Sequence, residues 1–368
     1  MPGPDIQIMT VPGVRQLQPY LPGKPTEELE RELGIQSIIK MASNENPLGP
    51  PARVTQIIAE QTHGLARYPD DSGFQLKSAL AAYLGVDAGQ ITFGNGSSQV
   101  LELVVRAFVQ PGERVIMSEY AFVVYSLAAQ AVDADLVVVP AKNWGHDLET
   151  MAASVDANTR VVFIANPNNP TGTWIDCAAL EAFLKRMPDH VITVVDEAYF
   201  EYVDDADFPD AVALLRRWPG LIATRTFSKI YALAGLRIGY AVASSGITEV
   251  LNRIRQPFNV NSLGLVAASE ALTETEFVQH SRRINKAGMV QLCQGFQKLG
   301  LEYIPSKGNF ISVDVGGPAE AVYERLLRQG VIVRPVANYG MPQHLRITIG
   351  LEQENDQALT ALETALAR

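Results

Sequence analysis

Three apolar stretches of the chain are each followed by polar side chains that could do chemistry. The stretches, which read as short β-strands, are residues 160–164, 191–195 and 221–226. The side chains that follow them are an amide, a carboxylic acid with a phenol, and an amine: Asn169, Asp196 with Tyr199, and Lys229. Because the carboxyl ends of parallel strands face one crevice of a sheet, these groups are expected to converge there.

A pyridine aldehyde cofactor needs this set of groups. The Lys229 amine can form an imine with the aldehyde carbon, and the Asp196 carboxylate can keep the ring nitrogen protonated. Amide and phenol donors such as Asn169 and Tyr199 can hydrogen-bond the ring oxygen. Taken singly, each residue has a simpler interpretation. A lysine at a strand end is usually solvated, Asp196 could cap a helix or bind a metal, and residues 169–172 form a good turn.

An alternation of strands and helices from about residue 74 to 240 must position these groups. Further strands are expected at residues 90–93, 114–117 and 135–139, with helical periodicity at 98–108 and 176–186. Short apolar strands separated by helices predict an α/β domain whose parallel sheet is covered on both faces.

The C-terminal part of the chain has a different pattern. A long helix is expected from about residue 263 to 299, then strands at 309–315 and 344–349 and a helix at 318–329. This pattern predicts a smaller α+β domain. The expected organisation is an N-terminal segment that contributes to the smaller domain (1–47), a large domain (48–258), and a small C-terminal domain with its long connecting helix (259–368).

A glycine-rich turn between an expected strand and helix could bind an anion. The run from Gly94 to Gln99 would place the backbone N–H groups of Gly96, Ser97 and Ser98 at a helix start. A dinucleotide fingerprint is a rival interpretation, with an acidic residue about 20 positions on, but its third glycine is missing. Farther along the chain, Phe122 is expected to stack on a pyridine ring.

Composition limits the class of protein. The chain has 368 residues, is 47% hydrophobic and carries a formal net charge of −10, which argues against nucleic acid or an anionic membrane as the main partner. Its two cysteines, Cys177 and Cys293, and its five histidines show no metal-ligand spacing, so no bound metal is expected. No signal-peptide pattern and no membrane-spanning stretch are recognisable, so a cytoplasmic location is expected.

The combined motifs resemble those of the fold-type I aminotransferases that use pyridoxal 5'-phosphate. Asn-Pro-x-Asn-Pro-Thr-Gly at 166–172, Asp-Glu-Ala-Tyr at 196–199, and Ser-Lys at 228–229 followed by an arginine at 237 all match. The resemblance implies a large domain with a mostly parallel seven-stranded sheet between helices, plus a smaller α+β domain from both termini.

The same resemblance implies a role for each matching residue. Lys229 would be the Schiff-base lysine, and Asp196 would be the partner of the ring nitrogen. Together with Tyr199, these two residues would form the catalytic group. Asn169 would join Tyr199 in holding the ring oxygen. The cofactor phosphate would be bound by three further side chains, which are Arg237, Ser228 and Thr226.

Segments nearer the chain ends resemble the histidinol-phosphate aminotransferases in particular. They are residues 18–24, 43–49, 67–70, 330–335 and 345–350. The resemblance implies a homodimer in which Tyr68 reaches the cofactor phosphate of the neighbouring subunit. It also implies that the anionic substrate meets four side chains, which are Arg346, Arg334, Tyr20 and Asn309.

The implied reaction moves an amino group between L-histidinol phosphate and 2-oxoglutarate in histidine biosynthesis. Two departures bear on the substrate: the phosphate turn lacks the acidic residue of many relatives, and Phe122 stands where a tyrosine is common. Three alternatives stay open at this stage. They are an aromatic amino acid aminotransferase, a pyridoxal-phosphate decarboxylase of a phosphorylated amino acid, and a non-catalytic ligand-binding protein, against which the intact Lys229 argues.

Overall fold

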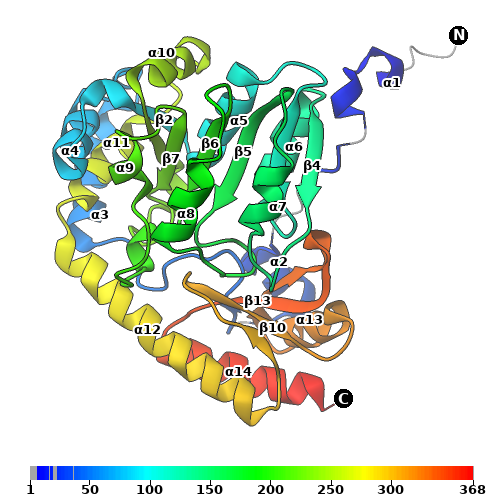
Figure 1. Ribbon diagram of the computed structural model, residues 1–368. Helices are drawn as coiled ribbons and strands as arrows, with labels where there is room; N and C mark the ends of the chain where they lie inside the picture. The colour runs from blue at the N-terminus through cyan, green and yellow to red at the C-terminus, as the bar shows by residue number, and fades with distance from the viewer. Residues whose placement is uncertain (1–5, 16, 20–22, 36, 368) are drawn as a thin grey trace, which may run out of the picture.

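The computed structural model describes residues 6–15, 17–19, 23–35 and 37–367, and a seven-stranded sheet forms the centre of its larger part (Figure 1). The strand order is β2-β8-β7-β6-β5-β3-β4. Their bounds are β2 Ile91–Asn95, β3 Arg114–Ser118, β4 Asp135–Val139, β5 Thr159–Ala165, β6 Ile192–Asp196, β7 Leu221–Thr226 and β8 Ile238–Ala243. The sheet is parallel except for β8, which runs antiparallel to both of its neighbours, so the prediction of a mostly parallel seven-stranded sheet is confirmed.

Helices cover both faces of this sheet because its strands are apolar on both sides. One apolar core is formed with α5 Ser97–Phe108, α6 Val123–Ala131 and α10 Ser245–Ile254. The other face packs mainly against α3 Ala52–Gln61, α4 Phe74–Leu84, α7 Leu148–Ala153, α8 Cys177–Leu184, α9 Ala211–Leu214 and α11 Ser262–Ala271. Two cores on one parallel sheet are the arrangement that continuous apolar strands require.

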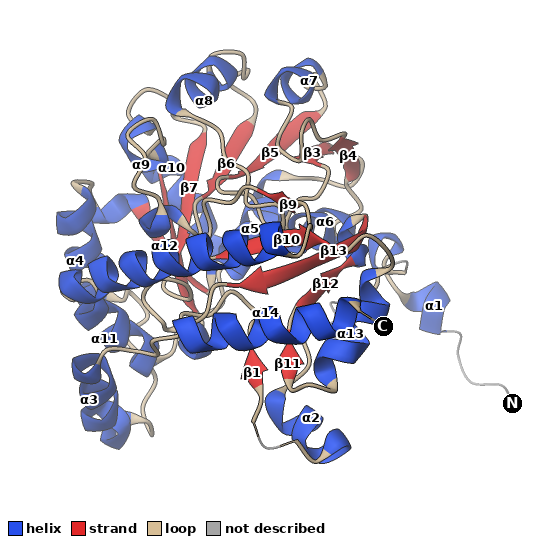
Figure 2. Ribbon diagram, turned by 90° about the horizontal axis from the view of Figure 1, so that it is seen from below, coloured by secondary structure: helices blue, strands red, loops and turns tan. Residues whose placement is uncertain are grey.

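A smaller part contains a second, antiparallel sheet in the order β12-β13-β10-β9. Its strands are β9 Tyr303–Ile304, β10 Phe310–Asp314, β12 Arg334–Val336 and β13 Met341–Thr348. Three helices pack their apolar sides around it, and Figure 2 shows two of them, α12 and α14, side by side. The three helices are α12 Thr275–Lys298, α13 Ala319–Leu327 and α14 Glu352–Leu366.

Residues from near the N-terminus join this smaller part. Strand β1, Ile39–Lys40, pairs in parallel with β11, Val331–Ile332, and Met41 lies in the same apolar core as α12 and α14. The other early helices are α1 Ile6–Met9 and α2 Thr26–Leu33. The expected contribution of the N-terminal segment therefore has a structural counterpart, while the boundaries at residues 47 and 258 stay a prediction.

The single long helix expected at residues 263–299 is wrong. The segment forms two helices, α11 and α12, separated by residues 272–274. At the break, the Thr273 hydroxyl and backbone N–H both donate to the carbonyl oxygen of Glu270, at 2.8 Å and 2.9 Å. A threonine that bonds the backbone locally competes with the helical ladder, which ends there, although the apolar periodicity continues past it.

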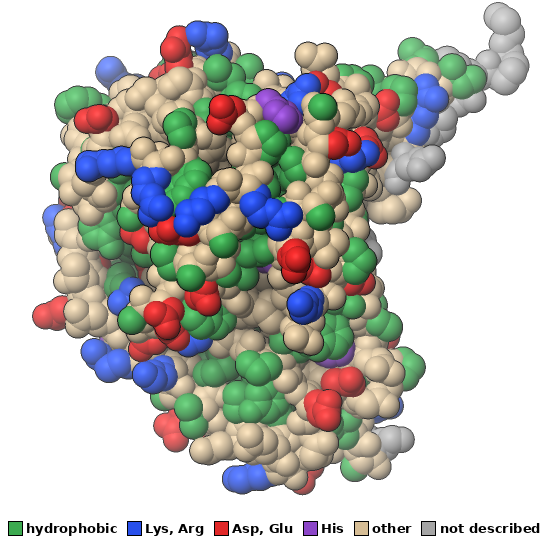
Figure 3. Space-filling model, viewed as in Figure 1, with side chains coloured by type: hydrophobic (Ala, Val, Ile, Leu, Met, Phe, Trp, Pro, Cys, Tyr) green, Lys and Arg blue, Asp and Glu red, His purple; other side chains and the backbone are tan. Residues whose placement is uncertain are grey.

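The carboxyl ends of β5, β6 and β7 face the smaller part. Contacts between the two parts include the Ser312 hydroxyl on β10, which donates to the carbonyl oxygen of Pro170 at 2.6 Å. On the face drawn in Figure 3, basic and acidic side chains lie interspersed, so that side presents mixed charge. Within the described ranges, every helix is too short or too polar to cross a membrane.

Candidate active site

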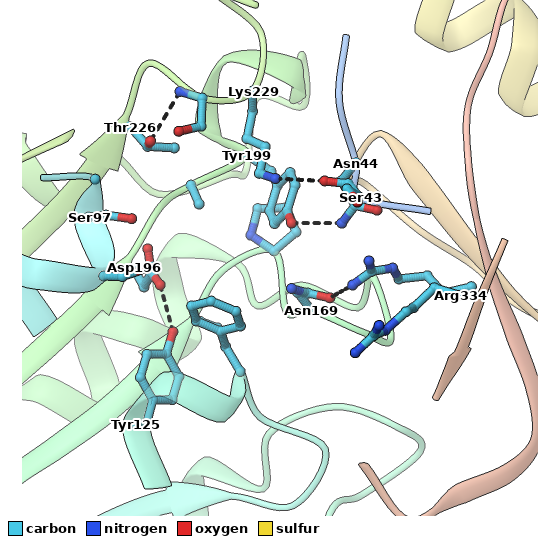
Figure 4. Close-up of a pocket in the computed structure, with 18 of the residues that line it drawn as sticks. Ser43, Asn44, Ser97, Tyr125, Asn169, Asp196, Tyr199, Thr226, Lys229 and Arg334 are labelled. Atoms are coloured by element: carbon cyan, nitrogen blue, oxygen red, sulfur yellow. Dashed lines mark hydrogen bonds between the residues drawn. The ribbon is translucent and has the colours of Figure 1, made fainter. Parts of the chain in front are cut away.

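A cavity of about 190 Å³ lies where the ends of the parallel strands face the smaller sheet (Figure 4). Most of the side chains predicted from the motifs line it: Lys229, Asp196, Tyr199, Asn169, Gly96, Ser97, Ser98, Phe122, Thr226, Ser228, Arg237, Arg334 and Arg346. Residues that are separated by as many as 250 positions in the sequence are thus brought to one place. The structure therefore brings together the side chains that were expected to converge at the strand ends.

Lys229 follows the end of β7 and reaches into the cavity. Its Nζ atom donates a hydrogen bond to the carbonyl oxygen of Ser43 at 3.1 Å. Burial of the ammonium group, reinforced by the positive charge of Arg346, lowers its pKa to about 8. A lysine with that pKa is neutral far more often near pH 7 than an ordinary lysine, so its nitrogen is available as a nucleophile or base.

Asp196 is the last residue of β6 and is only 5% exposed. Its Oδ2 atom accepts a hydrogen bond from the Tyr125 hydroxyl at 2.7 Å, and its Oδ1 atom accepts one from the Thr224 hydroxyl at 3.0 Å. Burial raises the pKa of the Asp196 carboxyl, whereas the two hydroxyl donors lower it. The site therefore supplies donors that favour the ionised carboxylate.

Tyr199 lies three residues beyond Asp196 and is held by the N-terminal segment. The side-chain amide of Asn44 donates to the Tyr199 hydroxyl oxygen at 2.8 Å, and the Phe310 ring packs edge-on against the phenol ring. Burial raises the pKa of Tyr199 to about 12, so its hydroxyl keeps a proton to donate over the physiological range. Asn44 itself has φ 55°, a left-handed backbone that asparagine tolerates better than most residues.

The start of α5 forms a cradle with the shape of an anion site. Gly96 caps the helix with φ 75°, and a Cβ atom added there would lie 2.6 Å from Nη2 of Arg237. A Cβ on Gly239 would lie 2.3 Å from the backbone nitrogen of Ser97, so glycine is required at both positions. The N–H of Gly96, predicted to meet an anion, instead donates to the carbonyl oxygen of Arg237 at 2.9 Å. The N–H groups of Ser97 and Ser98 at the helix start, next to the guanidinium, are left to attract negative charge.

Two arginines of the smaller sheet complete the wall of the cavity. Arg346, which is 7% exposed, donates through Nη2 to the carbonyl oxygen of Ala42 at 2.7 Å and through Nη1 to Oδ1 of Asn169. Arg334 on β12 is 9% exposed and also lines the cavity. Buried guanidinium groups beside a cavity are suited to bind a carboxylate or phosphate by paired hydrogen bonds.

A sequence model of the family described as aminotransferase class I and II matches residues 36–362. The chain belongs to this family. It is 57% identical over 359 residues to histidinol-phosphate aminotransferase 2 of Pseudomonas fluorescens, with 97% of both chains covered. It is 53% identical over 354 residues to histidinol-phosphate aminotransferase 1 of Nitrosococcus oceani, with 96% of both covered.

Solved structures of aminotransferases agree with the fold of the chain. The histidinol-phosphate aminotransferase of Sinorhizobium meliloti, in complex with pyridoxal-5'-phosphate, superposes on it with a TM-score of 0.89. The two sequences are 30% identical, and the match covers 97% of each chain. The expected fold class is therefore confirmed.

Three residues predicted for this aminotransferase site lie elsewhere or outside the description. Tyr68 is 82% exposed on the surface, where its ring stacks on Phe258 at 4.7 Å. Asn309 does not line the cavity, and its amide instead donates to the carbonyl oxygen of Asn44 at 3.0 Å. Tyr20 lies outside the described residues.

Among the polar side chains that line the aminotransferase cavity, sequence reasoning missed four, which are Ser43, Asn44, Tyr125 and Tyr339. For Tyr125 a signal was present, because it follows Phe122 by three positions at the start of a helix, and residues so spaced share a helix face. For Ser43 and Asn44 the motif at 43–49 marked the segment, but local pattern cannot show which distant side chains a loop meets. Within the described ranges, no group of three or more His, Cys, Asp or Glu residues could hold a metal ion.

Proposed function

We propose that this aminotransferase moves an amino group between L-histidinol phosphate and 2-oxoglutarate, with pyridoxal 5'-phosphate as its cofactor. The observation that carries the proposal is one cavity that holds the Lys229 amine, the buried Asp196 carboxylate and the cradle at the start of α5. In addition, relatives that are more than half identical over nearly their whole length bear the name histidinol-phosphate aminotransferase.

The cradle at the start of α5 fits the phosphate of the cofactor. Gly96 lets the Arg237 guanidinium, and Gly239 lets the start of α5, pack closely, because a Cβ atom at either position would clash with them. The N–H groups at that helix start can then meet an anion beside the guanidinium. Arg237 lies against Gly96, and the Ser228 and Thr226 side chains line the same cavity. A guanidinium, hydroxyls and helix N–H groups are the donors that a phosphate monoester needs.

The remaining groups fit the pyridine ring. Asp196 supplies a carboxylate for the ring nitrogen, Tyr199 and Asn169 supply donors for the ring oxygen, and Phe122 offers an aromatic face. When bound, pyridoxal phosphate contributes an electron-withdrawing ring that stabilises negative charge on the α-carbon of the substrate. The donor set of the chain therefore matches the cofactor feature by feature.

Three side chains of the protein act on protons during the reaction. The Lys229 amine, whose pKa is about 8, would take the proton from the α-carbon of the substrate and deliver it to the C4′ carbon of the cofactor. The ionised Asp196 carboxylate keeps the ring nitrogen protonated, which preserves the electron withdrawal. The Tyr199 hydroxyl stays protonated and donates to the ring oxygen.

The anionic ends of both substrates would meet the guanidinium groups of Arg334 and Arg346. L-histidinol phosphate carries a phosphate and 2-oxoglutarate carries two carboxylates, and each charge-assisted bond contributes roughly 1.5–3 kcal/mol. Asn169, which accepts a bond from Arg346, links the substrate end of the cavity to the cofactor end. One arginine pair can thus serve both half-reactions in turn.

We also propose that two copies of the chain form a dimer in the cytoplasm and share their active sites. Several large apolar side chains on α4 and in the segment before it are exposed. They are Leu65 at 57% exposed, Tyr68 at 82%, Phe74 at 69% and Tyr83 at 55%. Exposed large apolar side chains such as Tyr68 support a protein–protein interface that includes this residue.

A panel of amino donors tests the proposed substrate. The purified protein is given 2-oxoglutarate with histidinol phosphate, phenylalanine, tyrosine or aspartate, and glutamate formation is measured. We expect kcat/KM for histidinol phosphate to exceed that for aspartate about a hundredfold, because a site built for a phosphate rejects ligands that leave its donors unsatisfied. Comparable kcat/KM values for histidinol phosphate and aspartate would overturn the proposed substrate. A preference for phenylalanine would favour an aromatic aminotransferase, and carbon dioxide release without glutamate would favour a decarboxylase.

The catalytic lysine has its own test. Lys229→Ala is expected to remove both transfer activity and the visible absorbance that bound cofactor gives, since no other amine lines the cavity among the described side chains. Lys185→Ala, which alters an exposed lysine at the end of α8, is the matched control and should leave both unchanged. Full activity in Lys229→Ala would refute the mechanism.

A further inference from the structure

Tyr125 is a buried tyrosine whose role in the site the motifs do not explain. It lies on α6 and is 0% exposed. Its ring stacks on Phe163 at 4.5 Å with an interplanar angle of 1°, and it meets the ring of Phe122 edge-on at 5.9 Å. These two contacts hold the ring in one orientation, with its hydroxyl directed at Asp196, as Figure 4 shows.

The Asp196 carboxylate receives one neutral donor on each oxygen. The Tyr125 hydroxyl donates to Oδ2 at 2.7 Å, and the Thr224 hydroxyl, from the neighbouring strand β7, donates to Oδ1 at 3.0 Å. A carboxylate can accept about four hydrogen bonds in total, so beside these two and the backbone bond from Ala198 there is room for one from a ligand in the cavity. Two anchors also fix the plane of the carboxylate.

Charge gives the Tyr125 bond a second consequence. A buried carboxylate tends to take up a proton, and hydrogen bonds to its ionised form oppose that tendency. Burial, together with the Asp196 charge, raises the pKa of Tyr125 well above its ordinary value, so the phenol remains an O–H donor at any working pH. The Tyr125 hydroxyl therefore keeps donating to Asp196, whereas a partner with a pKa near neutral would lose its proton.

We propose that Tyr125 is a positioning residue that keeps Asp196 ionised and aimed at the ring nitrogen of the cofactor. The proposal rests on the proposed function, because it assumes that Asp196 meets that nitrogen. Thr224 shares the task at the other oxygen. The Tyr125 hydroxyl donates to Asp196, so its loss should act on the ring nitrogen contact and leave the phosphate contacts intact.

The test measures affinity with two ligands rather than activity. Apoprotein is titrated with pyridoxal phosphate and, separately, with an analogue that has a carbon in place of the ring nitrogen. Quenching of tryptophan fluorescence measures the binding of each ligand. Tyr125→Phe should lower the affinity for pyridoxal phosphate about ten- to a hundredfold at neutral pH, which is the effect of one charge-assisted hydrogen bond. It should leave the affinity for the analogue within about twofold, since the analogue offers the carboxylate no N–H.

The pH dependence gives an independent readout. Two titrating groups face the cofactor here, Asp196 and the nearby Lys229, whose pKa is about 8. Loss of the Tyr125 donor raises the pKa of Asp196, so the acid side of the binding profile should move up by about 1 to 2 pH units, whereas the side set by Lys229 should stay in place. Thr224→Val, which removes the other hydroxyl with little change of shape, should shift the profile in the same direction. Tyr240→Phe, a buried tyrosine on β8 that does not line the cavity, is the control and should shift nothing.

Three outcomes decide the matter. Selective weakening of pyridoxal phosphate in both Tyr125→Phe and Thr224→Val supports the proposal. Equal weakening of both ligands in Tyr125→Phe, or no change with either ligand, overturns it, since the first means lost packing and the second no role. If the native apoprotein binds the two ligands equally well, Asp196 does not meet the ring nitrogen, and it is that part of the proposed function that fails.

Discussion

Arg334 and Arg346 lie directly opposite each other on the antiparallel strands β12 and β13. Like charges in that relationship destabilise a sheet, and burial of both guanidinium groups adds to the cost. An anion bound between the two arginines and the catalytic centre would offset this cost. It also affects Lys229, whose pKa is lowered first by burial and next by the charge of Arg346.

Replacing Arg346 by glutamine should therefore raise the pKa of Lys229. Removal of a nearby positive charge makes the ammonium form less costly, so a smaller fraction of the amine is neutral at pH 7. The measurement is the pH dependence of the rate at which the apoprotein amine reacts with an aldehyde. We expect a midpoint near 8 in the native protein and a clearly higher one in Arg346→Gln.

The charge-preserving variant Arg346→Lys is the control for that experiment. It should keep the Lys229 midpoint close to the native value while still weakening substrate binding, because lysine cannot form the paired bonds of a guanidinium. An unchanged midpoint in Arg346→Gln would mean that burial alone sets the pKa of Lys229.

Gly239→Ala should disturb the cradle at the start of α5. The new Cβ atom would lie 2.3 Å from the backbone nitrogen of Ser97, so either the helix start or β8 must move. Loss of one charge-assisted bond to a phosphate is expected to lower affinity for pyridoxal phosphate about ten- to a hundredfold. Gly235→Ala, where the added Cβ meets nothing within 4 Å, is the matched control. Equal affinities in the two variants would contradict the cradle.

A buried ion pair joins the strand ends that carry Asp196 and Lys229. Arg225 on β7 donates through Nε to Oε2 of Glu197 at 2.9 Å, and the second oxygen of Glu197 accepts from the backbone nitrogen of Ala211 at 2.9 Å. Glu197→Ala should lower the free energy of unfolding by about 3–5 kcal/mol, because it leaves a buried guanidinium without its main partner. Urea denaturation measures this loss.

The control for that prediction is a pair of the same type on the surface. Glu249 and Arg253 on α10 form an i,i+4 pair with side chains 68% and 66% exposed. Solvent screens such a pair, so Glu249→Ala should change the free energy of unfolding by less than about 0.5 kcal/mol. If Glu197→Ala costs no more than this, the buried pair does not hold the two strand ends together.

Local pattern was enough to predict most of the fold but not all of it. Strands β4 and β7 have the expected bounds, 135–139 and 221–226, because each is a compact apolar run with clear ends. Strand β8, Ile238–Ala243, was not among the strand candidates: its glycine and alanines have little preference for strands. The break between α11 and α12 was missed because its cause is one threonine side chain.

The same limit applies to the site. The cofactor motifs lie within a few residues of strand ends, so their convergence follows from the geometry of a parallel sheet. The contacts of Ser43 with Lys229 and of Asn44 with Tyr199 join residues 186 and 155 positions apart. Such pairs depend on how the N-terminal segment packs between the two sheets, which one sequence does not encode in any local pattern.

The loop that carries Tyr68 is held in place by a charged clamp. The Asp71 carboxylate accepts bonds from both Nη atoms of Arg255, at 2.8 Å and 2.6 Å, and from the backbone nitrogen of Phe258 at 2.6 Å. These bonds lower the pKa of Asp71 to about 2, so the clamp is ionised at any working pH. The Phe258 ring in turn stacks on Tyr68, which is otherwise exposed.

Such a clamp makes sense if Tyr68 serves the partner subunit in the proposed dimer, and mixed dimers can test this. Tyr68→Phe and Lys229→Ala subunits are unfolded together and refolded. Each mixed dimer then contains one intact site, with the lysine of one subunit and the tyrosine of the other. Random pairing should restore activity to about a quarter of the native value, above the mean of the two parents.

Asp71→Asn should complement Lys229→Ala in the same way, because it acts through Tyr68. Absence of any gain on mixing would show that Tyr68 acts within its own subunit or not at all.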